Sequence, residues 1–131
     1  MRHLVLTLSL SLLTVFISCV GQEDSAIKIV TAEEMQSLFD MEGVQLIDIR
    51  TPEEYNEGHI KNFQNINFYA DDFEKRLESL DKTKPVVIHC RSGHRSGKCA
   101  KLMKEKGFLE IYDFTGGILV WEEKDLKLIT N

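Results

Sequence analysis

The sequence predicts an α/β fold with one domain, built on a mostly parallel central sheet of about five strands with helices on both faces. Three observations favour this fold. Short apolar runs alternate with amphipathic segments from residue 27 onward, as expected for strands that alternate with helices. The run "VVIH" at 86–89 is bounded by turn residues and is typical of a buried central strand. A length of 131 residues with 43% hydrophobic content suits one core rather than two.

Local sequence signals predict where the helices begin and end. The first helix begins with a capping box, Thr31 followed by Glu34, and a second helix ends at Gly58. The helix that follows the central strand is expected from Ser92 to Lys106, where Gly107 stops it. Strands are expected at 27–30, 44–49, 64–68, 86–89 and 110–114, and helices at 31–39, 52–57, 71–80, 92–106 and 118–124.

The first 18 residues predict a signal peptide. Arg2 is followed by an apolar stretch with no charge and then by small residues, and this stretch is too short for a comfortable membrane span. "FISC" resembles a bacterial lipobox, so Cys19 is expected to carry the lipid, although cleavage after Gly21 stays open. We therefore expect an exported protein, periplasmic or membrane-anchored, with a tether at 19–26 and the domain at 27–131.

Charge and composition exclude several kinds of partner. The net charge of −5 argues against a nucleic-acid surface. No C-x-x-C pair or close Cys and His cluster is present, and the arginines beside His94 would repel a cation, so we expect no metal and no cofactor. The domain is expected to act as a monomer.

The stretch "IHCRSGHRSGK" at 88–98 carries the candidate chemistry. Cys90 follows the central strand, where ligands of open α/β sheets bind. The turn into the next helix can aim backbone amides at this thiol, and the amides, the helix dipole and two arginines favour the thiolate. Cys99 lies on the inward side of the helix and is expected to be core. A disulfide between the two is not expected, because Cys99 lies nine positions further on, along the helix, and bridged Cα atoms must lie within about 7 Å.

Three motifs, in order, resemble the single-domain rhodaneses: "LIDIRTPEEYNEGHI", "CRSGHRS" with its C-x4-R loop, and "FTGGILVW". The resemblance covers residues 27 to about 127. It implies transfer of a sulfane sulfur from a donor such as thiosulfate to cyanide or a thiol, through a persulfide on Cys90. It also implies that Arg91 holds the donor's sulfonate and that Arg95 closes the loop and adds positive field. The expected substrate-binding residues are Arg91, Ser92, Gly93, His94, Arg95 and Ser96.

The remaining motif residues are interpreted as structural. Asp48 and Arg50 are expected to form a buried ion pair, and Glu54 and His59 to tie loops together. His89 should face away from Cys90, because successive strand residues alternate between faces. The other structural motif residues are Gly116, Gly117 and Trp121, the last in the core. "GHIKNF" departs from the Gly-His-Ile-Pro-Gly-Ala of the family, so the turn after His59 is expected to differ.

Two other classes of function stay open. Cysteine phosphatases share this architecture, but their loop is C-x5-R, and only four residues separate Cys90 from Arg95. A non-catalytic module that binds a sulfur carrier or partner protein would not need the thiol. The sequence does not identify the physiological donor or acceptor.

Overall fold

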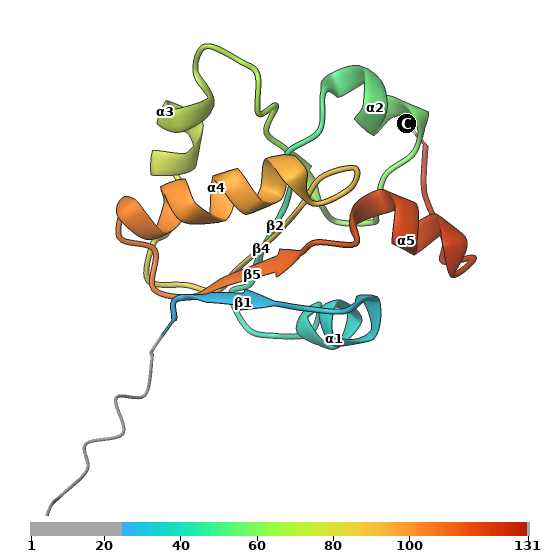
Figure 1. Cartoon of the computed structure of the whole chain (residues 1–131), viewed down its shortest axis with the longest axis horizontal. Coiled ribbons are helices and arrows are strands. Elements are labelled where there is room, and N and C mark those ends of the chain that lie inside the picture. Colours follow the sequence, from blue (N-terminus) through green and yellow to red (C-terminus); the bar gives the residue numbers. More distant parts are fainter. Residues whose placement is uncertain (1–24, 131) are drawn as a thin grey trace, which may run out of the picture.

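Five parallel strands form one sheet in the order β1-β5-β4-β2-β3 (Figure 1). The computed structural model describes residues 25–130, so the predicted signal peptide and Cys19 lie outside the described residues. The strands are β1 (Ile27–Ile29), β2 (Gln45–Asp48), β3 (Gln64–Asn65), β4 (Val86–His89) and β5 (Ile111–Phe114). The predicted sheet of about five parallel strands is confirmed.

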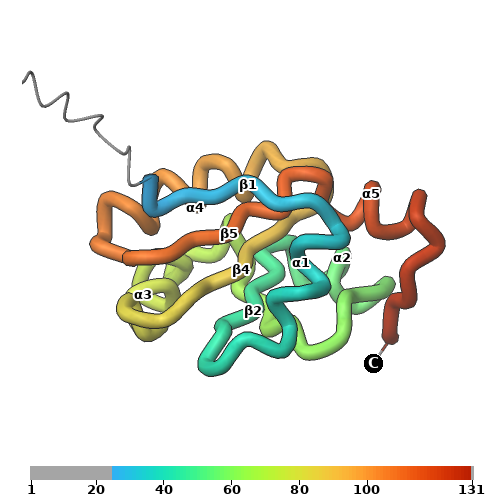
Figure 2. Tube along the Cα trace, turned by 90° about the horizontal axis from the view of Figure 1, so that it is seen from below, coloured from blue at the N-terminus to red at the C-terminus, as the bar shows by residue number. Residues whose placement is uncertain are grey.

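Helices cover both faces of this sheet, and the two faces bury separate hydrophobic clusters. The helices are α1 (Ala32–Leu38), α2 (Pro52–Glu57), α3 (Phe73–Glu78), α4 (His94–Glu105) and α5 (Gly117–Glu123). Side chains of α3 and α4 pack on one face, and those of α1 and α5 pack on the other. In Figure 2, seen from below, α1 crosses the sheet on the side opposite to α4.

Strand β4 lies at the centre, between β2 and β5, and all four of its residues are buried. Its side chains alternate: Val86 and Ile88 join the cluster under α4, whereas Val87 joins the cluster under α1 and α5. Because all the strands are parallel, their carboxyl ends meet at one edge of the sheet. The residue after β4 therefore lies at the middle of that edge.

Local signals set most of the helix boundaries. Both Thr31 and Thr51 form complete capping boxes with the glutamate three residues on, and Gly58 caps the end of α2 as predicted. Helix α4 begins at His94, two residues later than predicted. The reason is Gly93, whose φ of 92° is left-handed and ends the loop before the helix.

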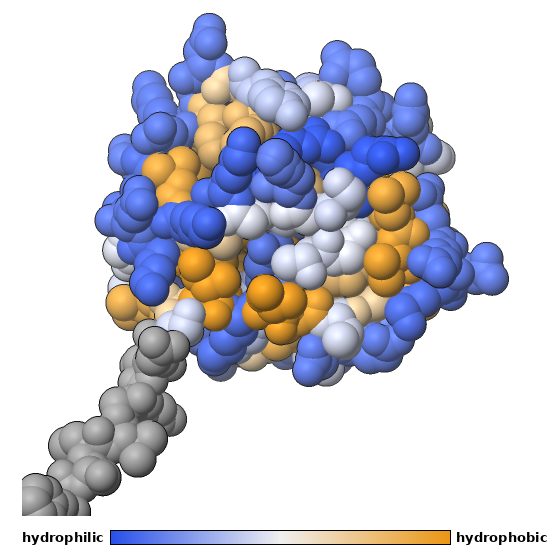
Figure 3. Space-filling model, viewed as in Figure 1, coloured by the Kyte–Doolittle hydropathy of each residue, from blue (hydrophilic) through white to orange (hydrophobic). Residues whose placement is uncertain are grey.

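The surface of the domain is mainly hydrophilic. In Figure 3 the hydrophobic side chains form separate patches among charged ones. The large apolar side chains that are most exposed are Ile29, Leu109, Tyr69 and Leu119. Within residues 25–130, no helix has the length and apolar character needed to cross a membrane.

Candidate active site

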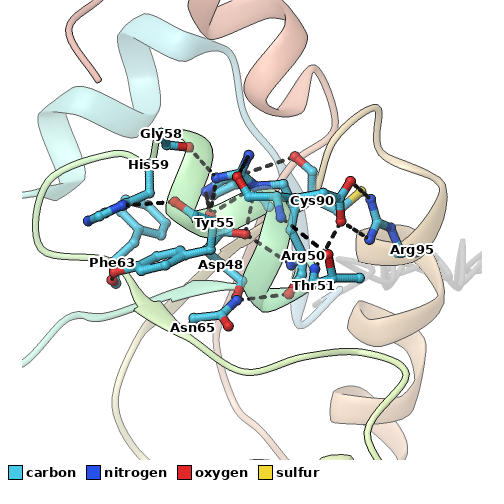
Figure 4. A network of polar contacts seen from close by, with 12 residues as sticks. Asp48, Arg50, Thr51, Tyr55, Gly58, His59, Phe63, Asn65, Cys90 and Arg95 are labelled. Atoms are coloured by element: carbon cyan, nitrogen blue, oxygen red, sulfur yellow. Dashed lines mark hydrogen bonds and ion pairs between the residues drawn. The ribbon is translucent and has the colours of Figure 1, made fainter. Parts of the chain in front are cut away.

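Cys90 is the first residue after β4 and is only 1% exposed. Its sulfur is held by the loop that follows: the Gly93 N–H donates a hydrogen bond to Cys90 Sγ, with 3.1 Å between nitrogen and sulfur. Figure 4 shows Cys90 close to Arg95 and to the polar network of Asp48 and Arg50. A hydrogen bond from a backbone amide favours the charged form of a thiol over the neutral form. Cys90 thus lies at the carboxyl edge of the sheet, where it was expected, and its role as a nucleophile stays a prediction.

Gly93 is required by the packing of this loop against the turn after β5. A Cβ atom at Gly93 would lie 2.3 Å from the carbonyl oxygen of Thr115, which no side chain allows. The left-handed φ of Gly93 disfavours other residues as well. The amide that reaches Cys90 Sγ therefore depends on a glycine.

The second of the two glycines at 116–117 packs closely against the backbone of the same loop. Gly117 also has a positive φ, of 59°, and a Cβ there would lie 2.6 Å from the Cys90 carbonyl oxygen. This close approach lets the Ile118 and Leu119 N–H groups donate to the carbonyl oxygens of Cys90 (3.0 Å) and Arg91 (3.2 Å). The start of α5 thus anchors the backbone of Cys90 and Arg91, a contact that the sequence motifs did not predict.

Arg95 closes the loop through an ion pair with α2. Its guanidinium donates to both carboxylate oxygens of Glu54, at 2.7 and 2.8 Å. This contact, with the Thr51 amide, lowers the pKa of Glu54 to about 2 against the effect of burial. The expected loop-closing role of Arg95 fits this geometry, but Glu54 offsets the positive field that was also expected.

In the described part of the chain, Arg91 is the cation left available beside Cys90. It is exposed, and its side chain has no hydrogen bond or ion pair among the described residues. It borders a cavity of about 180 Å³, whose other lining residues are Arg50, Glu54, Glu57, Gly58, Ile118, Leu119 and Glu122. Ser92 and His94 are also exposed in the loop. Their contacts with a donor, and those of Arg91, stay predictions.

The predicted buried ion pair of Asp48 and Arg50 is present. Arg50 Nη2 lies 2.7 Å from Asp48 Oδ2, and Asp48 is completely buried. Arg50 also donates to the carbonyl oxygens of Glu54 (3.1 Å) and Gly58 (2.8 Å). The pair therefore joins β2 to both ends of α2 and fixes the wall that presents Glu54 to Arg95.

The two histidines near the site have structural contacts. His89 is fully buried, and its Nδ1 lies 3.0 Å from the Cys90 carbonyl oxygen; its Nε2 is 3.4 Å from Asp48 Oδ2 but has no hydrogen bond. Burial lowers the pKa of His89, so the ring stays neutral. His59 stacks on Tyr55 at 3.8 Å between centroids. Neither residue is placed as a base for Cys90.

Trp121 is 4% exposed and lies in the core, as predicted. In the turn after His59, Asn62 has a φ of 70°, and the Phe63 N–H donates to the Ile60 carbonyl oxygen at 3.3 Å. Phe63 is buried and contacts the His89 ring edge-on. The change in sequence thus adds an aromatic residue to the core beneath the site.

Three buried polar or sulfur-containing residues lie where α4 packs on the sheet. Cys99 is a free thiol with 0% exposure, and burial raises its pKa to about 12. Ser96 is also 0% exposed, and its hydroxyl donates to the Gly93 carbonyl oxygen at 3.3 Å. Asp113, in β5, is 2% exposed. It was not predicted as a site residue, although an acidic residue inside the apolar stretch "IYDF" indicates a buried carboxyl.

Comparison with known proteins agrees with this geometry. Residues 31–124 match the family described as "Rhodanese-like domain". The chain belongs to this family. A sulfurtransferase of Allochromatium vinosum is 33% identical over 94 residues, which cover 72% of this chain and 86% of that protein. The thiosulfate sulfurtransferase GlpE of Pseudoalteromonas translucida is 32% identical over 100 residues, or 74% and 90% of the two chains.

The fold comparison gives the same family. The crystal structure of a rhodanese-like domain protein from Staphylococcus aureus superposes with a TM-score of 0.67 and 28% identity, and covers 79% of this chain and 98% of that one. The rhodanese-like relatives thus share both the sequence pattern and the five-stranded architecture. Among residues 25–130, no group of three or more metal-ligating side chains is close enough to hold an ion.

Proposed function

We propose that this rhodanese-like protein is a sulfurtransferase that uses Cys90 to move a sulfane sulfur from thiosulfate to a thiophilic acceptor. The Cys90 thiolate attacks the outer sulfur of thiosulfate, the S–S bond of the donor breaks, and sulfite leaves with the bonding electron pair. Cyanide or a thiolate then attacks the outer sulfur of the Cys90 persulfide. Thiocyanate or an acceptor persulfide leaves, and the Cys90 thiolate is regenerated.

The hydrogen bond from Gly93 N–H to Cys90 Sγ carries this proposal. A preorganised amide stabilises negative charge on sulfur, both on the Cys90 thiolate that attacks the donor and on the Cys90 thiolate that is expelled when the acceptor takes the outer sulfur. The relatives named as sulfurtransferases, one of them a thiosulfate sulfurtransferase, support the same chemistry.

Arg91 is the candidate binding group for the donor. It is the unpaired cation next to the nucleophile in the described part of the chain, and it borders the cavity between α2 and α5. A guanidinium can bind two oxygens of a sulfonate at once. Arg91 would hold the SO₃ end of thiosulfate while the outer sulfur meets Cys90.

The test is the mass of the purified protein after incubation with thiosulfate. We expect a gain of one sulfur that cyanide removes, with thiocyanate as the product, and no gain in Cys90→Ser. Aryl phosphate hydrolysis, measured in parallel, addresses the phosphatase alternative: a four-residue spacer makes a smaller cradle than a phosphate group needs. Phosphate release faster than thiocyanate formation would contradict the proposal.

We also propose that the protein is exported and anchored through a lipid on Cys19. The support is the apolar leader and its lipobox-like end.

Membrane fractionation of the full-length chain expressed in a bacterium tests the anchor. Wild-type protein should partition with the membrane, and Cys19→Ala should be released or misprocessed. A soluble mature protein that begins at Gln22 would show cleavage after Gly21 and contradict lipidation.

A further inference from the structure

Asp113 is a buried acid that forms no ion pair within residues 25–130. It lies in β5, paired in register with Ile88 of β4 and Ile29 of β1, which are apolar. From α4 it is faced by Ser96, Gly97 and the neutral thiol of Cys99. Its Oδ1 has no hydrogen-bond partner. An ionised carboxylate is strongly disfavoured in such surroundings, since a buried charge needs a partner.

Asp113 lies on the same face of the sheet as Cys90. Strand residues alternate between faces, so Asp113, Ile88 and Cys90 all point toward α4. Burial raises the pKa of Asp113, and the nearby Ser96 hydroxyl, which can donate to the ionised carboxylate, works in the opposite direction. The carboxyl is therefore poised to exist in the neutral form, which can donate a hydrogen bond.

Ser96 connects this acid to the active loop. Its hydroxyl donates to the Gly93 carbonyl oxygen at 3.3 Å, and Gly93 is the residue whose N–H binds Cys90 Sγ. A hydroxyl has one hydrogen to donate. Ser96 can hold Gly93 only while it does not donate to Asp113, so a neutral Asp113 that donates to Ser96 is compatible with the loop contact and an ionised Asp113 competes with it.

We propose that Asp113 is a positioning residue of the sulfur-transfer site. In its protonated form it donates to Ser96, which leaves the Ser96 hydroxyl on Gly93 and keeps the Gly93 amide aimed at the Cys90 sulfur. Loss of the Asp113 proton turns the Ser96 hydroxyl toward the carboxylate and removes one support of the loop. The inference rests on the proposed function for its consequence in turnover, but the contact itself can be tested without a sulfur donor.

The central experiment compares wild type with Asp113→Asn. Asparagine has nearly the same shape, can donate to Ser96 at every pH and cannot ionise. The rate of Cys90 alkylation by iodoacetamide is measured from about pH 4 to about pH 9, the span in which a carboxyl with a raised pKa titrates. The ratio of wild-type to variant rate cancels the intrinsic titration of the thiol.

We expect this ratio to be near one at the acid end and to fall about three- to tenfold as Asp113 ionises, the effect of one lost hydrogen bond. The ratio of kcat/KM for thiosulfate should follow the same curve. A ratio that does not change with pH would overturn the proposal, because a merely structural role of Asp113 would lower the rate equally at all pH values.

Two further variants separate the proposed link from Asp113 through Ser96 to Gly93 from a direct effect of the carboxylate charge. In the Ser96→Ala background, Asp113→Asn should no longer change the pH profile, because the hydroxyl that links Asp113 to Gly93 is gone. A purely electrostatic effect of the Asp113 carboxylate on Cys90 would persist in this background and would contradict the proposed link through Ser96. Asp40→Asn removes an exposed carboxylate of the turn after α1 and should leave the profile as in wild type. Thermal unfolding confirms that each variant is folded.

The wild-type protein alone provides a direct readout should Asp113→Asn not fold. Infrared spectra in D₂O should show a protonated carboxyl band that persists above the pH at which exposed carboxyls ionise. Absence of that band overturns the proposal. Persulfide formation is followed by mass in the same samples: no gain of sulfur would contradict the proposed function, while the alkylation profile would still decide the role of Asp113.

Discussion

The two described cysteines lie nine residues apart and are both buried free thiols, yet their surroundings differ completely. Cys90 ends a strand, accepts a hydrogen bond from Gly93 N–H and has Arg91 beside it. Cys99 lies in the middle of α4, within the hydrophobic cluster, and burial raises its pKa to about 12. The two buried thiols therefore differ in their hydrogen bonding: in the described part of the chain, a backbone amide donates to the sulfur of Cys90, and Cys99 has only the surrounding core.

The largest expected effect of any single substitution is that of Cys90→Ser. The hydroxyl nearly preserves the volume but cannot form a persulfide, so thiocyanate formation should fall to the uncatalysed rate while thermal unfolding changes little. The assay is thiocyanate release with thiosulfate and cyanide. Retention of most of the activity would mean that Cys90 is not the sulfur carrier.

Gly93→Ala tests whether the amide makes the difference between the two thiols. The new Cβ would meet the Thr115 carbonyl oxygen at 2.3 Å, so the loop must shift. A shift of about 1 Å can reduce the rate about a hundredfold, and the strain should lower stability by about 1–3 kcal/mol. We expect at least a tenfold loss of kcat/KM for thiosulfate, measured beside the unfolding free energy.

Gly97→Ala is the matched control, one turn further along α4. The nearest atom to its added Cβ is Asp113 Oδ2 at 4.0 Å, an ordinary contact, and alanine favours the helix by about 0.5–1 kcal/mol. Activity should stay within about twofold of wild type. Equal losses in the two alanine variants would contradict a special role for the Gly93 amide.

The ion pair of Glu54 and Arg95 should have an intermediate effect. Glu54→Gln keeps the capping box of α2, since glutamine can also bond the Thr51 amide, but it removes the charge that holds Arg95. We expect a loss of kcat/KM of about fivefold to tenfold through a looser loop. Glu34→Gln, in the equivalent capping box of α1 where no arginine is bound, should leave activity unchanged.

This pair also predicts a dependence of stability on pH. The pKa of Glu54 falls from its ordinary 4.5 to about 2 in the folded protein. The stabilisation is therefore complete above about pH 4.5 and is lost as the pH falls toward about 2. The difference in unfolding free energy between wild type and Glu54→Gln should shrink over this range, and a difference that grows toward acid pH would contradict the assignment.

Features that depend on neighbouring residues could be predicted from the sequence. The capping box at Thr31 and the end of α2 at Gly58 follow from spacing along the chain. The buried pair of Asp48 and Arg50 joins residues two positions apart. Cys90 was found because its loop directly follows a strongly apolar strand.

The contacts that complete the site join distant segments, and the sequence did not predict them. Glu54 and Arg95 are 41 residues apart and meet only because β2 lies beside β4 in the sheet. The amide of Ile118 reaches Cys90 because β5 lies on the other side of β4. Asp113 faces α4 for the same reason. Strand order, which short motifs do not encode, decides all three.

Cys99→Ala is expected to have the smallest effect on activity. Its thiol is buried in the hydrophobic cluster under α4 and contributes packing there, so thiocyanate formation should stay within about twofold of wild type. Loss of the sulfur leaves a small cavity that lowers stability by about 1–2 kcal/mol.

Mass spectrometry after a short exposure of the native protein to iodoacetamide at neutral pH completes the comparison. The chain truncated to residues 25–131, which lacks Cys19, should gain one label, on Cys90, and Cys99 should be labelled only after unfolding, because a thiol with a pKa of about 12 is almost wholly protonated. The Cys99→Ala variant should give the same single label at the same rate. Turnover that is lost in a folded Cys99→Ala variant would instead identify Cys99 as a resolving thiol for the persulfide, and the contrast between an activated and an inert cysteine would have to be abandoned.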